Sequence, residues 1–302
     1  MAREKGLPSP FPRKRFGQHF LEPAWVEKLL RAVAPGPEQT FLEIGPGLGA
    51  LTRPLAARAG RVVAFEIDRD LVSALRDAAP SHLTIVEGDF LQVTAERLRD
   101  LLTGDAGGWA ERAPFSARAR AEDPTRTPIR VVGNLPYNVA SPILFKLVEL
   151  YSGGVPLADA TVMLQREVAD RLVASPGTRK YGVLSVLIGQ TASLHRLFTL
   201  PPGAFRPMPK VHSAVVRLRF HAPAPAPTDP AVFRAIVQAI FTRRRKTLAN
   251  ALLAYEAGRE PFVPDLLRRA DLDGRRRPET FTIAELVRLA DAFASVSRRA
   301  VL

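Results

Sequence analysis

The stretch that decides the fold lies at residues 41–49 and reads FLEIGPGLG. Its first part, Phe41–Ile44, has the apolar character of a buried strand, and a glycine-rich turn follows at once. Gly45 and Gly47 suit this turn because a residue without a Cβ lets the chain bend sharply and lets a ligand approach the backbone. A helix expected to begin near Ala50 would direct its first N–H groups toward that ligand. We therefore expect a strand–turn–helix unit with a binding site at the turn.

Short apolar runs alternate with helical stretches from residue 40 to about residue 162. This alternation predicts an α/β fold, in which a parallel sheet is covered by helices on both faces. We expect strands at 41–44, 62–65, 83–86, 129–132, 161–164 and 214–220, with helices at 51–58 and 70–79.

Two segments interrupt this pattern. Residues 103–127 mix Gly, Pro, Ala and charged residues without an apolar period, which predicts an exposed, flexible insertion. Residues 221–228, HAPAPAPT, are typical of an extended linker. The chain after the linker has helical periodicity and lacks the pattern of a strand, with helices expected at 232–255, 262–270 and 283–295. We therefore expect an α/β domain over 1–220 and a small all-α domain over 229–302.

The composition narrows the class of protein. The chain of 302 residues is 46% apolar, which is ordinary for a globular protein, and it contains no cysteine, so disulfides and thiolate metal sites are excluded. No apolar run approaches the ~20 residues of a membrane span, and no secretory signal is evident, so we expect a cytoplasmic protein. The net charge of +13 is concentrated at 1–20 and 200–302, which favours a polyanionic partner such as nucleic acid. A GC-rich genome that favours arginine is the alternative explanation.

Acidic residues follow the second and third expected strands. Glu66 ends the second strand, where a carboxylate can accept hydrogen bonds from both hydroxyls of a ribose, and Asp89 follows the third, where it can hold an adenine amino group. Gly45, Gly47, Ala50 and Glu66 also fit the dinucleotide fingerprint, so an NAD-dependent oxidoreductase stays open at this point. The additional acid Asp89 is typical of class I methyltransferases and has no part in that fingerprint.

The fourth expected strand runs into Asn134-Leu135-Pro136-Tyr137. Ligand sites of open α/β sheets lie at the carboxyl ends of strands, so this corner should face the cofactor. The Asn134 side-chain oxygen and the Leu135 carbonyl can accept from the two hydrogens of an adenine N6, which directs its lone pair at a methyl group. Pro136 stiffens the corner and has no competing N–H, while the Tyr137 ring can stack on a flipped-out base. This chemistry needs no metal, and we expect none.

These motifs resemble the KsgA family of small-subunit rRNA adenine dimethyltransferases. The Asn134–Tyr137 motif is the hallmark of amino methyltransferases. Residues 15–21 resemble the N-terminal motif of the family, which implies cofactor contacts at His19, where the family often has Asn, and at Leu21. Residues 205–213 resemble its proline-rich motif, which implies that Phe205 is a second stacking wall for the adenine. Residues 242–248 resemble its basic segment, which implies RNA contacts at Arg243, Arg244, Arg245 and Lys246. The insertion at 103–127 departs from the family.

The resemblance implies a Rossmann-like class I methyltransferase domain with a mostly parallel seven-stranded sheet. It implies S-adenosylmethionine as methyl donor, and as cofactor-binding residues His19, Leu21, Gly45, Gly47, Glu66, Asp89 and Asn134. The substrate implied is a pair of adjacent adenines in the 3′-terminal hairpin loop of 16S rRNA in the immature 30S subunit, with RNA across the cleft between the two domains. We expect a monomer.

Several alternatives remain at the level of sequence. A 23S rRNA methyltransferase of the macrolide-resistance type shares the catalytic motifs, and a non-catalytic ribosome assembly factor could keep them without activity. His212 could be a general base, although adenine N6 needs only solvent or a weak acceptor for its proton. Phe20 and Trp25 are expected in the core rather than against a base.

Overall fold

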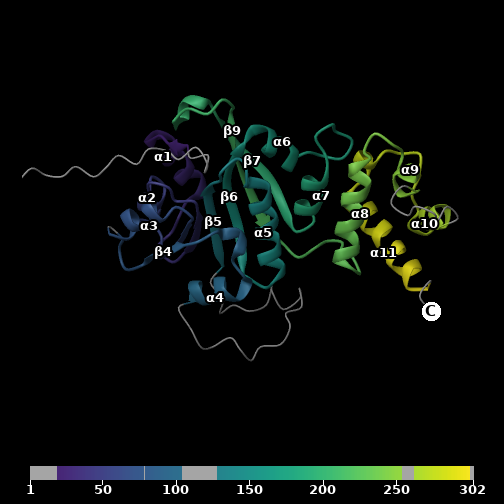
Figure 1. The fold of residues 1–302 in the computed structure, drawn as a ribbon, viewed down its shortest axis with the longest axis horizontal. Coiled ribbons are helices and arrows are strands. Elements are labelled where there is room, and N and C mark those ends of the chain that lie inside the picture. Colours follow the sequence, from purple (N-terminus) through teal and green to yellow (C-terminus); the bar gives the residue numbers. More distant parts are fainter. Residues whose placement is uncertain (1–18, 78, 104–127, 254–261, 300–302) are drawn as a thin grey trace, which may run out of the picture.

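The protein is described by a computed structural model covering residues 19–77, 79–103, 128–253 and 262–299 (Figure 1). Apart from residue 103, the insertion predicted at 103–127 lies outside these described residues. Figure 1 shows a central sheet with helices around it and, beside it, a group of helices near the C-terminus.

The central sheet has seven strands in the order β4-β3-β2-β5-β6-β9-β7. The first five in this order run parallel, while β9 is antiparallel to both of its neighbours, which confirms the predicted mostly parallel sheet. The sequence did not reveal β7. The bounds are β2 Thr40–Ile44, β3 Arg61–Glu66, β4 Leu83–Glu87, β5 Ile129–Asn134, β6 Leu157–Gln165, β7 Ala192–Leu200 and β9 Ser213–Phe220.

Side chains alternate between two cores because successive residues of a strand point to opposite faces. Leu42 and Ile44 of β2 belong to the core on one face and Phe41 to the core on the other. The Phe41 core contains residues of α1 Pro23–Val33, α2 Thr52–Ala56 and α3 Arg69–Arg76. The opposite core contains residues of α4 Ala95–Thr103, α5 Ala140–Ser152, α6 Arg166–Leu172 and α7 Val183–Gly189. Short 3-10 turns occur elsewhere in the described chain, at η2 Phe90–Gln92, η4 Pro202–Ala204 and η5 Pro278–Thr280. The sheet is thus the central layer of three.

A two-stranded antiparallel ribbon joins distant parts of the sequence. In this ribbon, β1 Phe20–Leu21 pairs with β8 Phe205–Arg206, so that Leu21 lies opposite Phe205. The ribbon therefore brings the N-terminal motif beside the proline-rich motif, which the sequence alone had placed about 185 residues apart.

The C-terminal helices enclose a third core that includes residues of α7. They are α8 Pro230–Thr242, α9 Leu248–Leu253, α10 Phe262–Ala270 and α11 Ile283–Arg299. Asp229 caps α8 by accepting from the backbone of its first turn, so the helix begins where the predicted linker ends. The linker itself is held by a bond from Thr228 N to Asp291 Oδ1 of 2.7 Å. No described helix is long and apolar enough to cross a membrane.

The helix predicted over 232–255 is wrong as one continuous element. It ends at Thr242 and restarts at Leu248. The break follows from tertiary contacts, because the Leu248 and Ala249 amides donate to the carbonyls of Arg276 (2.8 Å) and Gly274 (3.0 Å) in another loop. These bonds satisfy the first N–H groups of α9, which a continuous helix would have used internally.

Candidate active site

One cavity lies at the carboxyl edge of the parallel strands. The register aligns Ile44 with Phe65 and with Gly133, so the ends of β2, β3 and β5 meet there. The cavity brings together every residue that the sequence predicted for the cofactor: His19, Leu21, Gly45, Gly47, Glu66, Asp89 and Asn134. Leu135, Pro136 and Tyr137 line the same cavity. The cofactor site and the Asn134–Tyr137 corner, which were predicted separately from the sequence, therefore line one cavity.

The glycine-rich turn requires glycine for conformation and for space. Gly45 and Gly47 have φ values of +71° and +59°, in the left-handed region that side chains with a Cβ rarely adopt. A Cβ on Gly47 would lie 3.1 Å from the ring of Phe20. Phe20 is half-buried and lines the cavity, so the prediction that it is a core residue is wrong. The turn is thus shaped by both its backbone and its neighbour.

Glu66 is held by three backbone N–H groups. One carboxylate oxygen accepts from Ile67 N and Asp68 N at 3.0 Å each, and the other accepts from Gly47 N at 3.0 Å. The side chain is only 5% exposed. These three bonds tie the end of β3 to the glycine-rich turn.

Asp89 occupies a more open position at the edge of the same cavity. It follows β4, is exposed, and accepts from Leu91 N through Oδ1 at 2.9 Å. This bond caps the short turn η2 and fixes the side chain. The second carboxylate oxygen has no bond of this kind to a described residue and can accept from a ligand.

Glu43 is a cavity residue to which the sequence assigned no role. It lies on β2 two residues before Gly45, and its side chain is 1% exposed. Burial raises the pKa of the Glu43 carboxyl to about 8; Thr52 opposes this rise, and the charge of Glu66 adds to it. Its Oε2 atom has no hydrogen-bond partner among the described residues. A strand-end acid within the glycine motif was the available signal, but its burial could not be seen from sequence.

The Asn134 side chain has a defined orientation. Its Nδ2 donates to the backbone carbonyl of His19 at 2.7 Å, which leaves the side-chain oxygen Oδ1 as the acceptor. The corner after it is anchored by a bond from Leu135 N to Met163 O of 3.1 Å, and the Leu135 side chain is buried. The predicted acceptor is therefore held in place by the N-terminal segment.

Tyr137 is fixed at both ends. Its hydroxyl shares a 2.7 Å hydrogen bond with Ser213 Oγ, and its ring stacks on His19 with centroids 5.5 Å apart. Burial raises the pKa of Tyr137 above its usual range, although the Ser213 bond partly lowers it, so the hydroxyl stays protonated at neutral pH. His19 also shares a 2.7 Å hydrogen bond between Nδ1 and Pro207 O. His19 thus joins the N-terminal, Asn134–Tyr137 and proline-rich motifs.

The prediction for Phe205 is corrected by the structure. The ring is fully buried in the core that contains α1 and does not line the cavity. It could face a substrate base only by leaving that core, which would cost roughly the transfer free energy of a buried aromatic side chain, about 2–3 kcal/mol. His212 lies in a separate depression with Arg166 and Lys210, so it is not placed as a base in this cavity. Trp25 packs at the edge of the core, as expected.

The basic segment at residues 243–246 forms a turn between α8 and α9, within the range 232–255 that was predicted as one helix. Arg243, Arg245 and Lys246 are exposed. Arg244 Nη2 donates to Arg179 O at 2.7 Å and lines the groove between the two domains. This groove also contains Arg171, Arg179 and Lys180, together with Glu167, which pairs with Arg171, so the groove has a net positive charge.

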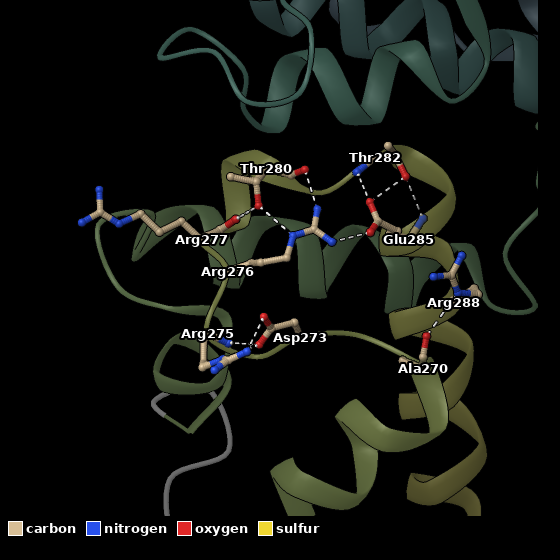
Figure 2. Close-up of polar contacts among 9 residues, drawn as sticks. All are labelled: Ala270, Asp273, Arg275, Arg276, Arg277, Thr280, Thr282, Glu285 and Arg288. Atoms are coloured by element: carbon tan, nitrogen blue, oxygen red, sulfur yellow. Dashed lines mark hydrogen bonds and ion pairs between the residues drawn. The ribbon is translucent and has the colours of Figure 1, made fainter.

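A second arginine-rich loop, residues 275–277, is joined to the helix that follows this turn. The backbone carbonyl of Arg276 in this loop accepts a hydrogen bond from Leu248 N at 2.8 Å. Figure 2 shows how its side chains differ. Arg276 is an internal brace, which donates to Glu285 Oε1 at 2.6 Å and to Thr280 O at 2.7 Å. Arg275 pairs with Asp273 at 3.1 Å. The Arg277 side chain points away from this network, while its backbone carbonyl accepts from Thr280 Oγ1 at 2.8 Å.

Comparisons with known proteins agree with this geometry. A family model described as ribosomal RNA adenine dimethylase matches residues 12–288. A ribosomal RNA small subunit methyltransferase A from Paracidovorax citrulli is 42% identical over 284 residues, which cover 94% of this chain and 98% of the relative. The protein of that name from Aromatoleum aromaticum is 41% identical over 295 residues, covering 96% and 97%.

Solved structures share the fold. A dimethyladenosine transferase from Plasmodium falciparum superposes with a TM-score of 0.69 at 21% identity, covering 93% of this chain and 98% of the other. The 23S rRNA methyltransferase ErmE superposes with a TM-score of 0.59 at 24% identity, covering 91% and 99%. At these identities the likeness establishes the architecture alone.

Proposed function

The chain belongs to the ribosomal RNA adenine dimethylase family, and we propose that it dimethylates two adjacent adenines of 16S rRNA. The methyl donor is S-adenosylmethionine, and the target is N6 of each adenine in the 3′-terminal hairpin loop. Four methyl transfers complete the reaction. The substrate is the immature 30S subunit, on which the protein acts as a monomer.

The chemistry of the cavity fits this donor. Glu66 and Asp89 offer carboxylate oxygens at successive strand ends, suited to ribose hydroxyls and to an adenine amino group. No Lys or Arg occurs among the described residues that line the cavity, although the chain has a net charge of +13. S-adenosylmethionine carries a net positive charge and supplies an electrophilic methyl group when bound, so an acidic lining favours it electrostatically.

The observation that carries the proposal is the position of Asn134 at the edge of this cavity. Because Nδ2 is engaged by His19 O, Oδ1 is presented as an acceptor. The N6 lone pair of adenine is delocalised into the ring and is a poor nucleophile. Acceptance of the two N6 hydrogens by Asn134 Oδ1 and the Leu135 carbonyl favours a pyramidal nitrogen whose lone pair faces the methyl group. Such positioning can contribute roughly 7–11 kcal/mol to catalysis.

The neighbouring residues limit what else can happen at the corner. Pro136 has no N–H that could donate to the reacting nitrogen. Tyr137 is held by Ser213 and stacked on His19, so its position is fixed before substrate arrives. The target adenine must leave its stack to reach this corner, and an aromatic ring at its edge compensates part of that cost. The proton of the methylated nitrogen passes to solvent.

The arginine-rich surface supports the choice of RNA. Arg243, Arg245 and Lys246 are exposed on the helical domain, and Arg171, Arg179 and Arg244 line the groove between the domains. Each cation that neutralises a phosphate releases a condensed counterion, which stabilises the complex without reading the sequence. Sequence is then selected by what fits the cavity.

Transfer of labelled methyl groups tests the proposal. The protein is incubated with labelled S-adenosylmethionine and, separately, with immature 30S subunits, 50S subunits and naked 16S rRNA, and the label is mapped by nuclease digestion and mass spectrometry. We expect N6,N6-dimethyladenosine at two adjacent positions near the 3′ end of 16S rRNA. Label on 23S rRNA would instead indicate the macrolide-resistance type of activity, and binding to subunits without label would indicate an assembly factor.

A further inference from the structure

Three carboxyl groups line the cavity, and they differ in how their charge is compensated. Glu66 accepts three backbone N–H bonds, and Asp89 is exposed and accepts one. Glu43 is 1% exposed, and its Oε2 has no hydrogen-bond partner among the described residues. A buried carboxylate oxygen without a donor makes ionisation of the group cost several kcal/mol, so the ionised form of Glu43 is favoured only when a positive charge lies close to it.

The groups facing Glu43 come from every element packed against it. From α2, Thr52 presents a buried hydroxyl, and from β3, Glu66 presents a negative charge. Across the cavity lie Asn134 at the end of β5 and His19 on the N-terminal segment, with Asp89 at the rim. No described Lys or Arg lines this space. The surroundings therefore hold the pKa of Glu43 at about 8, and the carboxyl is neutral at physiological pH.

The methyl donor and its product differ by one charge. S-adenosylmethionine carries a sulfonium, an ammonium and a carboxylate, for a net charge of +1, while S-adenosylhomocysteine lacks the sulfonium charge and is neutral overall. A positive charge within ~4–6 Å lowers the pKa of a carboxyl by about 1–3 units. Only the donor brings this additional charge into the cavity.

We propose that Glu43 distinguishes the methyl donor from its product: its carboxyl holds a proton in the cavity without ligand and releases it to solvent when the cationic donor binds. The inference rests on the proposed function, since it takes S-adenosylmethionine as the donor. The loss of the methyl group also removes the charge that kept Glu43 ionised, so Glu43 takes up a proton again. Product binding is then weakened relative to donor binding, which favours repeated turnover across four transfers.

The measurement is isothermal titration calorimetry of the whole protein in buffers of different ionisation enthalpy. For a pKa of Glu43 that falls by two units, S-adenosylmethionine releases about 0.8 proton at pH 7, and its affinity rises about tenfold or more from pH 6 to pH 8. S-adenosylhomocysteine releases far less. Equal proton release by the two ligands would overturn the inference.

Variants separate Glu43 from the other acids. Glu43→Gln should abolish the proton release and lower the preference for donor over product about tenfold at pH 7. Asp89→Asn is the matched control, because it removes an exposed carboxylate and should weaken both ligands while the proton release persists. Thr52→Val removes the hydroxyl that opposes the raised pKa, so the pH at which donor affinity rises should move upward.

The outcomes also separate this inference from the proposed function. If the donor binds and methylation of 16S rRNA proceeds, but Glu43→Gln keeps the proton release of the wild type, only the role of Glu43 is wrong. If the donor does not bind at all, the proposed function is wrong and the inference falls with it. Thermal unfolding of Glu43→Gln checks that the variant is folded, so that a loss of proton release on donor binding does not come from a misfolded cavity.

Discussion

The cofactor cavity and the surface of the helical domain carry opposite charges, and these charges differ in how far they are exposed to water. In the cavity, Glu43 and Glu66 are nearly inaccessible to water. On the helical domain, Arg243, Arg245 and Lys246 are exposed and form no ion pair with a described residue. Arg276 is the intermediate case, because its side chain is half-buried and is held by Glu285 and Thr280 (Figure 2).

This difference separates two uses of charge. A buried group interacts strongly with its neighbours because water does not screen it, so its protonation state and geometry determine the chemistry. An exposed group is screened by salt and contributes mainly to attraction of a polyanion. We therefore expect substitutions in the cavity to change rate or protonation, and substitutions on the helical surface to change RNA affinity and its dependence on salt.

The largest effect is expected at Asn134. Asn134→Ala should lower kcat/KM for methyl transfer at least ~100- to 1000-fold, by analogy with the loss of one donor or acceptor that acts on the transition state. The dissociation constant for S-adenosylmethionine, measured by calorimetry, should stay within about threefold. Asn250→Ala on α9, the same change away from the cavity, is the control and should keep full activity. A parallel loss of donor affinity would show that Asn134 mainly holds the donor.

Glu43→Gln should raise the free energy of unfolding, in addition to its effect on ligand binding. The pKa of Glu43 is raised from 4.5 to about 8 in the folded protein, so the folded state keeps a proton that the unfolded chain loses. The wild type therefore loses stability as pH rises from about 4.5 to about 8, and the variant does not. The expected gain in unfolding free energy is about 3 kcal/mol at pH 7.

Urea unfolding at pH 5 and pH 7.5 measures this difference for the wild type, the variant and a surface control. Glu27→Gln is a suitable control because Glu27 is exposed and pairs only with Arg58 on the surface. The interpretation fails if Glu43→Gln has the same pH dependence of stability as the wild type.

The paired substitution Arg243→Gln with Arg245→Gln should lower the affinity for the ribosomal subunit. We expect KM for the ribosomal subunit to rise about tenfold with little change in kcat, and the slope of log affinity against log salt to fall by roughly two, about one for each phosphate contact. Arg268→Gln with Arg269→Gln on α10 is the control, since both arginines pair with Asp265. A salt slope equal to that of the wild type would mean that the turn does not contact phosphate.

The smallest effect is expected at Glu285. Burial raises its pKa, but bonds from Arg276 and Thr282 outweigh this and hold the pKa of Glu285 at about 2. Its ionised form thus stabilises the fold above pH 4.5, and this contribution disappears as pH falls toward 2. Glu285→Gln keeps a side chain able to cap α11 and should lose about 1 kcal/mol at pH 7. Unfolding curves of the two proteins should converge near pH 2, and a constant difference would contradict this.

Much of the cavity could be predicted because the ends of buried strands can be recognised in the sequence from where apolar runs stop. The apolar runs that end at Ile44, Glu66 and Asn134 place the residues after them at one edge of a parallel sheet, and the structure brings them together there. Periodicity also predicted α10 with the correct bounds. These features depend on local pattern and on a general rule of topology.

The features that were missed depend on tertiary contacts. Phe205 belongs to a recognisable motif, but no sequence pattern shows that its ring points into a core. The edge strand β7 mixes exposed polar and apolar residues without a strict period. Residues 243–247 contain no Gly or Pro, and the helix break there is made by bonds to the loop at 274–276.

The most direct test of the account is a crystal structure of the protein with S-adenosylmethionine bound. We predict that the donor lies in the cavity lined by Glu43, Glu66 and Asp89, with its methyl carbon facing the space beside Asn134 Oδ1. That space should allow an amino nitrogen to approach the methyl carbon to about 3–3.5 Å. A donor bound elsewhere, or one whose methyl group points away from Asn134, would contradict the account.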